Sequence, residues 1–170
     1  EQASHLLLGS LLADGKIICC GSGVDHALAQ LLCANLLGRY QQERPALPAL
    51  CLGAEAASLG AMAAESGSEG SWARQLRALG QAGDTLVLVH SGGDESRQAL
   101  ALEAARERNM RAIALSNTAD GQVANLLGAE DVLLVSGAAQ RAQVVELHTM
   151  ILNTLCELVD LSLFGNYNQE

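Results

Sequence analysis

The stretch KIICCGSGVDHALAQLLCANLLGRY, residues 16–40, decides the fold. It opens with a short apolar run typical of a buried strand, passes through a Gly-Ser-Gly turn, and ends in a segment whose apolar residues recur at helical spacing. Gly21 and Gly23 permit positive φ angles and a close approach of a ligand to the backbone, and the helix that follows offers free N–H groups to an anion. We therefore predict a strand, a tight loop and a helix, with Gly21, Ser22 and Gly23 as a candidate ligand loop.

The chemistry of this loop leaves two interpretations open. A Gly-x-Gly turn alone is weak evidence for a phosphate site, because the same turn also joins strands to helices that bind nothing. Asp25 adds a carboxylate in the first turn of the helix, where it can cap the helix itself and repel a phosphate. A working anion site and a tight turn without a ligand are both compatible with these residues.

Apolar runs of strand type alternate with helical patterns along the rest of the chain. We expect strands at 16–20, 49–52, 85–89, 111–115 and 131–135, and helices at 4–12, 25–37, 72–79, 96–108, 120–127 and 140–161, with a further small-residue helix ending near residue 65. Repeated strand–helix units predict parallel strands joined by right-handed crossovers. The expected architecture is an α/β fold of flavodoxin-like type, a three-layer αβα sandwich around a five-stranded parallel sheet.

Composition excludes several classes of function. A chain of 170 residues with 49% hydrophobic residues is long enough for one domain with a sizeable core. The formal charge of −9 argues against a nucleic-acid surface, which needs clustered basic residues. Aromatic residues make up only 2% of the chain, so neither base-stacking platforms nor aromatic sugar-binding surfaces are available in quantity.

Cysteine usage and the absence of targeting patterns predict a cytoplasmic protein. The five cysteines lie in or beside apolar runs and include no Cys-x-x-Cys pair, which indicates buried free thiols in a reducing compartment. They are Cys19, Cys20, Cys33, Cys51 and Cys156. The sequence has no signal-peptide pattern at its start, and no apolar run approaches the roughly 20 residues of a membrane span.

A second glycine-containing loop follows the strand expected at 85–89. Both this loop and the first one belong to the carboxyl edge of the predicted sheet, where open parallel sheets bind ligands. Ser91, Gly92 and Gly93 offer hydroxyl and N–H groups to a phosphate, whereas Asp94 and Glu95 add negative charge. We interpret the two acids as ordinary first-turn residues of the next helix.

Metal binding and nucleophilic catalysis find no support in the residue pattern. His26 has only Gln30, a poor ligand, at i+4, and His148 has Glu146 nearby but no partner at i+4. Nothing specific around these two residues or His90 indicates a metal site, so we predict no metal and no other cofactor. Cys19 and Cys20 lie within a strand, away from a helix N-terminus or a fixed base.

The last predicted helix, residues 140–161, carries apolar residues on more than one side. A helix of this kind has two packing partners, of which one is its own sheet. We expect the other to be a second subunit, and hence a homo-oligomer.

Several motifs of the chain resemble one known family. CCGSG at 19–23, ERPALPAL at 43–50 and LHTMILNTLCELVDLSLF at 147–164 are similar to the SIS (sugar isomerase) family, which includes phosphoheptose isomerases and, more closely, DiaA-like DnaA initiator-associating proteins. The resemblance covers essentially residues 1–170 as a single SIS domain. Because the sequence starts at Glu1 without a methionine, we expect the family's first helix to precede it.

The resemblance implies a degenerate active site. Phosphoheptose isomerases bind a metal and perform acid–base chemistry with residues whose places are held here by Leu31, Asn35, Val145 and Asn153. A leucine and a valine cannot ligate a cation, and an asparagine has no useful pKa for proton transfer at neutral pH. The family's phosphate-binding hydroxyls fall on His90, Ser91, Gly92 and Glu95, and its first-loop serine falls on Asp25, so that only Ser91 keeps a hydroxyl.

The resemblance also implies a protein partner. The Leu-Phe pair with which DiaA-like proteins contact the initiator DnaA is present as Leu163 and Phe164, although Phe164 could instead anchor the end of its own helix. We therefore expect a non-catalytic, cytoplasmic homotetramer that binds DnaA and promotes its assembly at the origin. The alternatives are a phosphoheptose isomerase-like enzyme and a sugar-phosphate-binding sensor.

Overall fold

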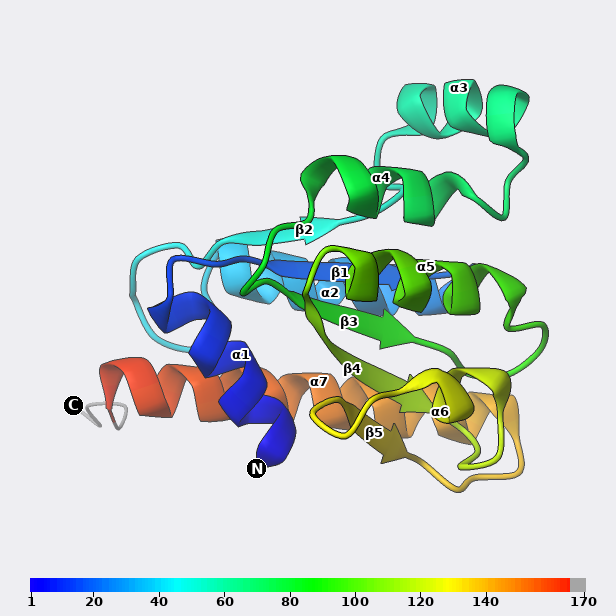
Figure 1. The fold of residues 1–170 in the computed structure, drawn as a ribbon. Helices are drawn as coiled ribbons and strands as arrows, with labels where there is room; N and C mark the ends of the chain where they lie inside the picture. The colour runs from blue at the N-terminus through cyan, green and yellow to red at the C-terminus, as the bar shows by residue number, and fades with distance from the viewer. Residues whose placement is uncertain (166–170) are drawn as a thin grey trace.

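The computed structural model describes residues 1–165, apart from the side chain of Ser66, and contains a five-stranded parallel sheet of order β2-β1-β3-β4-β5 (Figure 1). The strands are β1 (Ile17–Gly21), β2 (Ala49–Cys51), β3 (Thr85–Val89), β4 (Arg111–Ser116) and β5 (Val132–Val135). All neighbouring strands pair in parallel. The predicted fold class is confirmed.

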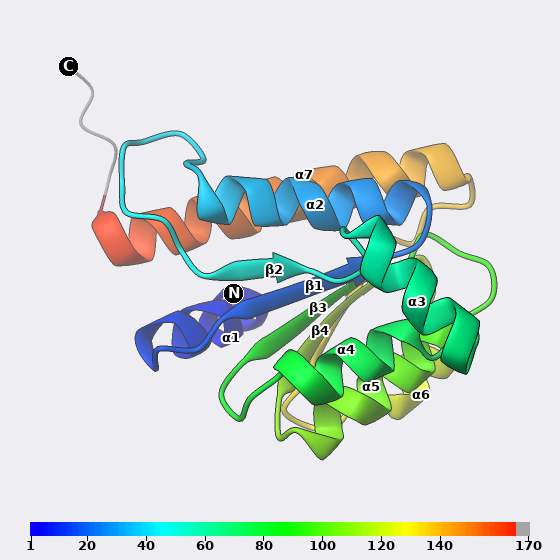
Figure 2. The ribbon, with the colours of Figure 1, turned by 90° about the horizontal axis from the view of Figure 1, so that it is seen from above.

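Helices cover both faces of this sheet. They are α1 (Gln2–Leu12), α2 (Val24–Leu37), α3 (Ala56–Ser66), α4 (Ser71–Leu79), α5 (Ser96–Glu107), α6 (Gln122–Leu126) and α7 (Arg141–Phe164). Figure 2 shows α2 and α7 side by side on one face and α4, α5 and α6 on the other. Helix α1 lies on the same face as α7, and α3 stands outside α4 (Figure 1).

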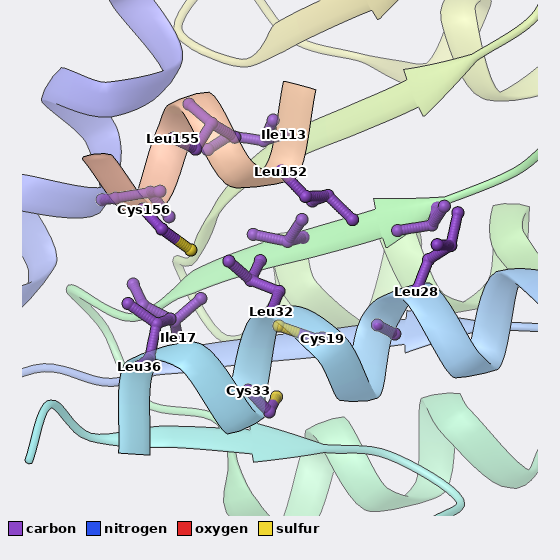
Figure 3. Packing of buried hydrophobic residues seen from close by; sticks show 14 of the residues in the cluster. Ile17, Cys19, Leu28, Leu32, Cys33, Leu36, Ile113, Leu152, Leu155 and Cys156 are labelled. Atoms are coloured by element: carbon purple, nitrogen blue, oxygen red, sulfur yellow. The ribbon is translucent and has the colours of Figure 1, made fainter. Parts of the chain in front are cut away.

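The alternation of side chains along each strand divides the core into two clusters. Ile17 and Cys19 of β1 face α1, α2 and α7, whereas Ile18 and Cys20 face α4 and α5. Figure 3 shows part of the first cluster, to which α2 contributes Leu32 and α7 contributes Leu152. Every residue of β1 and β3 is buried, as expected for the central strands of a parallel sheet.

Helix α7 is longer than the sequence pattern predicted. Its 24 residues include an 18-residue window of mean hydropathy 1.3, which by length and composition alone could cross a membrane. In the fold this helix packs on the sheet beside α2, and core helices often pass the same test. Met150 on α7 is 65% exposed, so a large apolar side chain remains on the side of the helix away from the core.

Candidate functional site

The two predicted loops meet at the carboxyl edge of the sheet. Gly21 at the end of β1 lies in register with Val89 at the end of β3, so the loops that follow are neighbours. Gly92 and Gly93 have φ angles of 124° and 103°, a region of backbone conformation that side chains other than glycine's rarely adopt. The residues predicted from the sequence therefore gather at one edge of the sheet.

Asp25 does not cap its own helix, and this corrects the expectation from its sequence position. Its side chain is only 2% exposed, and its Oδ2 accepts a hydrogen bond of 2.9 Å from the backbone N–H of Ser91. The second oxygen, Oδ1, has no hydrogen-bond partner among the described residues. Asp25 thus links the start of α2 to the loop after β3, using a donor that an anionic ligand would need.

Ser91 also contacts the last helix. Arg141, the first residue of α7, donates a hydrogen bond of 3.1 Å from Nε to Ser91 Oγ. Ser91 itself is 3% exposed, so both its N–H and its hydroxyl are engaged within the protein. Asp25, Ser91 and Arg141 therefore connect the N-terminal ends of α2 and α7 across the edge of the sheet.

Glu95 differs from the sequence expectation as well. Its Oε2 accepts a hydrogen bond of 2.7 Å from the N–H of Val123 in α6, rather than remaining a solvated first-turn acid. Its Oε1 lies 3.5 Å from His90 Nε2, and Gln98 donates from Nε2 to His90 Nδ1 at 2.9 Å. Asp94 behaves as expected, since its carboxylate accepts bonds from the N–H and hydroxyl of Ser96.

His148 lies beneath this network, fully buried at 0% exposure. Its Nε2 donates to the backbone carbonyl of Ser116, with 3.4 Å between the nitrogen and the oxygen. The pKa of His148 is lowered, chiefly because burial disfavours the imidazolium, while the Ser116 carbonyl and the charge of Asp25 partly offset this effect. His148 is therefore a neutral core residue in the folded protein at neutral pH.

We expect the protein to become less stable as the pH is lowered, because of His148. Below about pH 6.5 the unfolded chain binds a proton that the folded chain resists, so the free energy of unfolding decreases by at most about 1.4 kcal/mol per pH unit. His148→Asn should flatten this slope in urea titrations between about pH 5.5 and 7.5. His5→Asn, at an exposed position in α1, is the control and should retain the slope; an unchanged slope in His148→Asn would contradict the assignment.

A cavity of about 240 Å³ opens beside the first loop. Its lining residues are Gly21, Ser22, Gly23, His26, Gly53, Leu59, Trp72 and Arg97. The guanidinium carbon of Arg97 lies 5.0 Å from the centre of the Trp72 ring, a cation–π distance. The predicted site is therefore divided: the first loop lines a cavity, whereas Asp25 and Ser91 are buried in the network beside it.

Sequence reasoning missed two cations of this region, Arg97 and Arg141. Both lie at the start of a helix that leaves the carboxyl edge of the sheet, a position from which a side chain can reach a ligand loop. That position was the available signal, but an arginine in a first helical turn is also common on ordinary surfaces. With Arg97, the cavity can attract an anion despite the net negative charge of the chain.

Thiol chemistry at the edge of the sheet is unfavourable. Cys51, predicted to be buried, is only partly so, and its Sγ lies 3.8 Å from His26 Nδ1. A hydrogen bond with Cys33 and burial both raise the pKa of Cys51, so the thiol stays protonated and is a poor nucleophile. Cys19, Cys20, Cys33 and Cys156 are buried free thiols, as predicted.

Comparison with known proteins places the fold and this edge of the sheet in context. The family model for the SIS domain matches residues 1–117. The chain belongs to the SIS domain family. DnaA initiator-associating protein DiaA from Yersinia enterocolitica is 40% identical to this SIS domain over 164 residues, which cover 96% of this chain and 84% of the relative. DiaA from Pectobacterium carotovorum is 39% identical over 168 residues, covering 99% and 86%.

Solved structures of phosphoheptose isomerases share the architecture of this SIS domain. GmhA from Neisseria gonorrhoeae matches with a TM-score of 0.87 and 34% identity, over 94% of this chain and 83% of that chain. A phosphoheptose isomerase from Francisella tularensis matches with a TM-score of 0.89 and 31% identity, over the same shares of the two chains. The predicted family is thereby confirmed.

The four positions that the resemblance assigned to metal and acid–base chemistry lie on α2 and α7 of this SIS domain. Leu31 and Val145 pack against the first core cluster. Asn35 and Asn153 are partly buried, and the backbone carbonyl of Asn35 accepts a hydrogen bond from Arg44. Within residues 1–165 no group of three His, Cys, Asp or Glu side chains is arranged to hold a metal ion.

Leu163 and Phe164 form the end of α7. Leu163 is partly buried and packs against the first core cluster, whereas Phe164 is 39% exposed. The guanidinium carbon of Arg44 lies 6.0 Å from the centre of the Phe164 ring. The pair therefore combines an anchored leucine with a half-exposed aromatic ring.

Proposed function

We propose that residues 1–170 form a single, non-catalytic SIS domain that acts in the cytoplasm as an adaptor for the replication initiator DnaA. The observation that carries this proposal is about 40% identity, over nearly the whole chain, to proteins named DnaA initiator-associating protein. The site supports it as well, because Leu31 and Val145 cannot ligate a metal, and Asn35 and Asn153 supply no base.

The adaptor would act by multivalency. A homotetramer carries four copies of each surface, and several DnaA molecules held together at the origin have a raised effective concentration without any new chemistry. Leu163 and Phe164 are the proposed contact surface, since large apolar residues at a half-exposed position are typical binding anchors.

The test is a direct binding measurement. Purified DnaA is passed over the immobilised protein at two salt concentrations, and the same preparation is assayed for isomerisation of sedoheptulose 7-phosphate. We expect saturable binding of DnaA and no isomerase turnover. Turnover without DnaA binding would contradict the proposal and favour the enzyme.

A second candidate function is the binding of a sugar phosphate without catalysis. The cavity beside the first loop supports it, because Arg97 supplies a positive charge and the loop glycines permit a close approach to the backbone. The buried network opposes it, because Asp25 occupies the N–H of Ser91.

We expect the apolar outer face of α7 to form a subunit interface. Ile151→Asp would split the oligomer, but Ile151 also packs against the protomer's own core. Met150→Asp is the sharper variant, because this side chain is 65% exposed in the protomer and its replacement buries an unpaired carboxylate only in the assembly. Light scattering should show a tetramer for the unmodified protein and smaller species for Met150→Asp.

The control for this experiment is Leu79→Asp, which introduces the same charge at an exposed apolar position of α4 on the opposite face of the sheet. It should leave the tetramer intact. A folded monomer for the unmodified protein, or an intact tetramer for Met150→Asp, would show that the interface lies elsewhere.

A further inference from the structure

Arg44 is a fully buried cation at the end of two helices. Its side chain and that of Asp160 are both 0% exposed, and its Nε donates to Asp160 Oδ1 at 2.7 Å. Its Nη2 donates to the carbonyl of Asn35 at 2.6 Å, and its Nη1 donates to the carbonyl of Leu36 at 2.9 Å. Arg44 therefore joins the last turn of α2 to the last turns of α7.

The helix geometry explains why a cation is needed there. Figure 2 shows α2 and α7 side by side with their C-terminal ends on the same side of the molecule. Each C-terminal end carries a partial negative charge, and Asp160 adds a full one. Within the described residues neither helix has a basic residue in its own last turn. Arg44 donates directly to carbonyls at the end of α2 and to Asp160, and so places one positive charge between the two helix ends.

The same guanidinium contacts Phe164. Phe164 follows Asp160 by four residues, so the two side chains lie on one face of α7. With its guanidinium carbon 6.0 Å from the ring centre, Arg44 is at the outer limit of a cation–π contact. One part of the ring therefore lies near Arg44, while 39% of the residue remains exposed.

We propose that Arg44 is a positioning residue that fixes the ring of Phe164 for contact with a partner protein. The part of this inference that concerns the partner rests on the proposed function; the fixing of the ring does not. A rigid aromatic anchor loses less conformational entropy on binding than a mobile one, so a preordered ring binds more tightly. The competing account is that Arg44 only stabilises the two helix ends and leaves the ring unaffected.

The ring can be observed on its own, because Phe164 is the only phenylalanine in the chain. Incorporation of 4-fluorophenylalanine gives one fluorine signal, whose shift and line width report the surroundings and mobility of this ring. Arg44→Lys keeps the charge but cannot form the same fork of hydrogen bonds. This variant should change both the chemical shift and the line width of the fluorine signal. Arg77→Lys, which alters an exposed ion pair with Glu107 on the other face of the sheet, is the control and should not.

A second variant distinguishes a loss of ring positioning from a loss of folding. Arg44→Met combined with Asp160→Leu removes both buried charges together, and such replacements are often neutral for stability. If Arg44 fixes the ring, this double variant should fold with its secondary structure intact and still show the altered fluorine signal. A wild-type signal in Arg44→Lys and in the double variant would overturn the positioning role.

A double-mutant cycle on DnaA binding then separates positioning from stability. Arg44→Lys should weaken binding about tenfold when Phe164 is present and less than twofold when Phe164 is already alanine. An equal factor in both backgrounds would mean that Arg44 acts only through stability and would overturn the proposal. If Phe164→Ala does not change DnaA binding, the proposed function of this surface fails, while the fluorine signal still decides whether Arg44 positions the ring.

Discussion

Replacing Phe164 with alanine is expected to weaken DnaA binding at least thirtyfold. Truncation of a large apolar anchor typically costs about 2 kcal/mol or more of binding free energy, and about 1.4 kcal/mol corresponds to a factor of ten. Multivalent binding magnifies the loss, because every subunit carries the same change. Since 39% of the residue is already exposed, we expect a loss of stability of only about 1 kcal/mol, or roughly 2–4 °C in melting temperature.

The measurement is DnaA affinity together with thermal melting and oligomeric state. Leu79→Ala is the matched control, because Leu79 is the last residue of α4 and is 44% exposed, but lies on the other face of the sheet. It should leave DnaA affinity unchanged. If Phe164→Ala melts many degrees lower or dissociates, and its folded fraction still binds DnaA normally, Phe164 is a structural anchor and not a contact residue.

The layers of this fold could be predicted because short stretches of the sequence indicate its strands and helices. The run IICCG, residues 17–21, is apolar throughout, short and followed by a Gly-containing turn, which is typical of a strand buried on both faces. The predicted positions of the helix ends were less accurate. Helix α7 was expected to end at 161 but continues to Phe164, because Leu163 packs against the core, and no local sequence pattern indicates that contact.

The roles of Asp25 and Glu95 could not be predicted from sequence. A first-turn carboxylate usually serves its own helix, whereas these two bind the N–H groups of Ser91 and Val123, 66 and 28 residues away. Such pairings depend on which loops the sheet order brings together. The sequence predicted parallel strands of a flavodoxin-like sheet, but the residue register that places Gly21 beside Val89 required the structure.

Arg44 shows a different limit. Its motif could be recognised as a family feature, but its function depends on a meeting of two helix ends that are far apart in sequence. Asp160 lies 116 residues away. A buried acid near the C-terminal end of a helix is unfavourable without a cation beside it, and the sequence does not show which cation that is. Motif recognition therefore located the residue without explaining it.

Sedoheptulose 7-phosphate is expected to bind with a dissociation constant above about 1 mM, which corresponds to a binding free energy weaker than about −4.1 kcal/mol. The N–H of Ser91 is already used by Asp25, and a phosphate at this loop would lie near the charge of that carboxylate. One such charge at ~4 Å is worth about 1–4 kcal/mol between water and a near-surface dielectric. The N-terminus of α2 offers only about 0.3–1 kcal/mol in return.

Arg97 is the one residue of the cavity lining that is positively charged at neutral pH whatever its surroundings, but part of its interaction is already with Trp72. Repulsion of the phosphate should therefore outweigh its attraction. Replacing both Asp25 and Glu95 with serine should strengthen phosphate binding at least tenfold. These replacements free the N–H groups of Ser91 and Val123 and remove two negative charges. Glu103→Ser with Glu130→Ser removes the same net charge from exposed positions and should not strengthen binding.

Titration calorimetry with sedoheptulose 7-phosphate distinguishes these cases, after circular dichroism has shown that each variant is folded. Micromolar affinity in the unmodified protein would show that the attraction of Arg97 outweighs the carboxylates, and would favour the sugar-phosphate sensor over an adaptor with an empty site. An equal gain in both double variants would instead mean that net charge, rather than the occupied N–H groups of Ser91 and Val123, controls phosphate binding at this edge of the sheet.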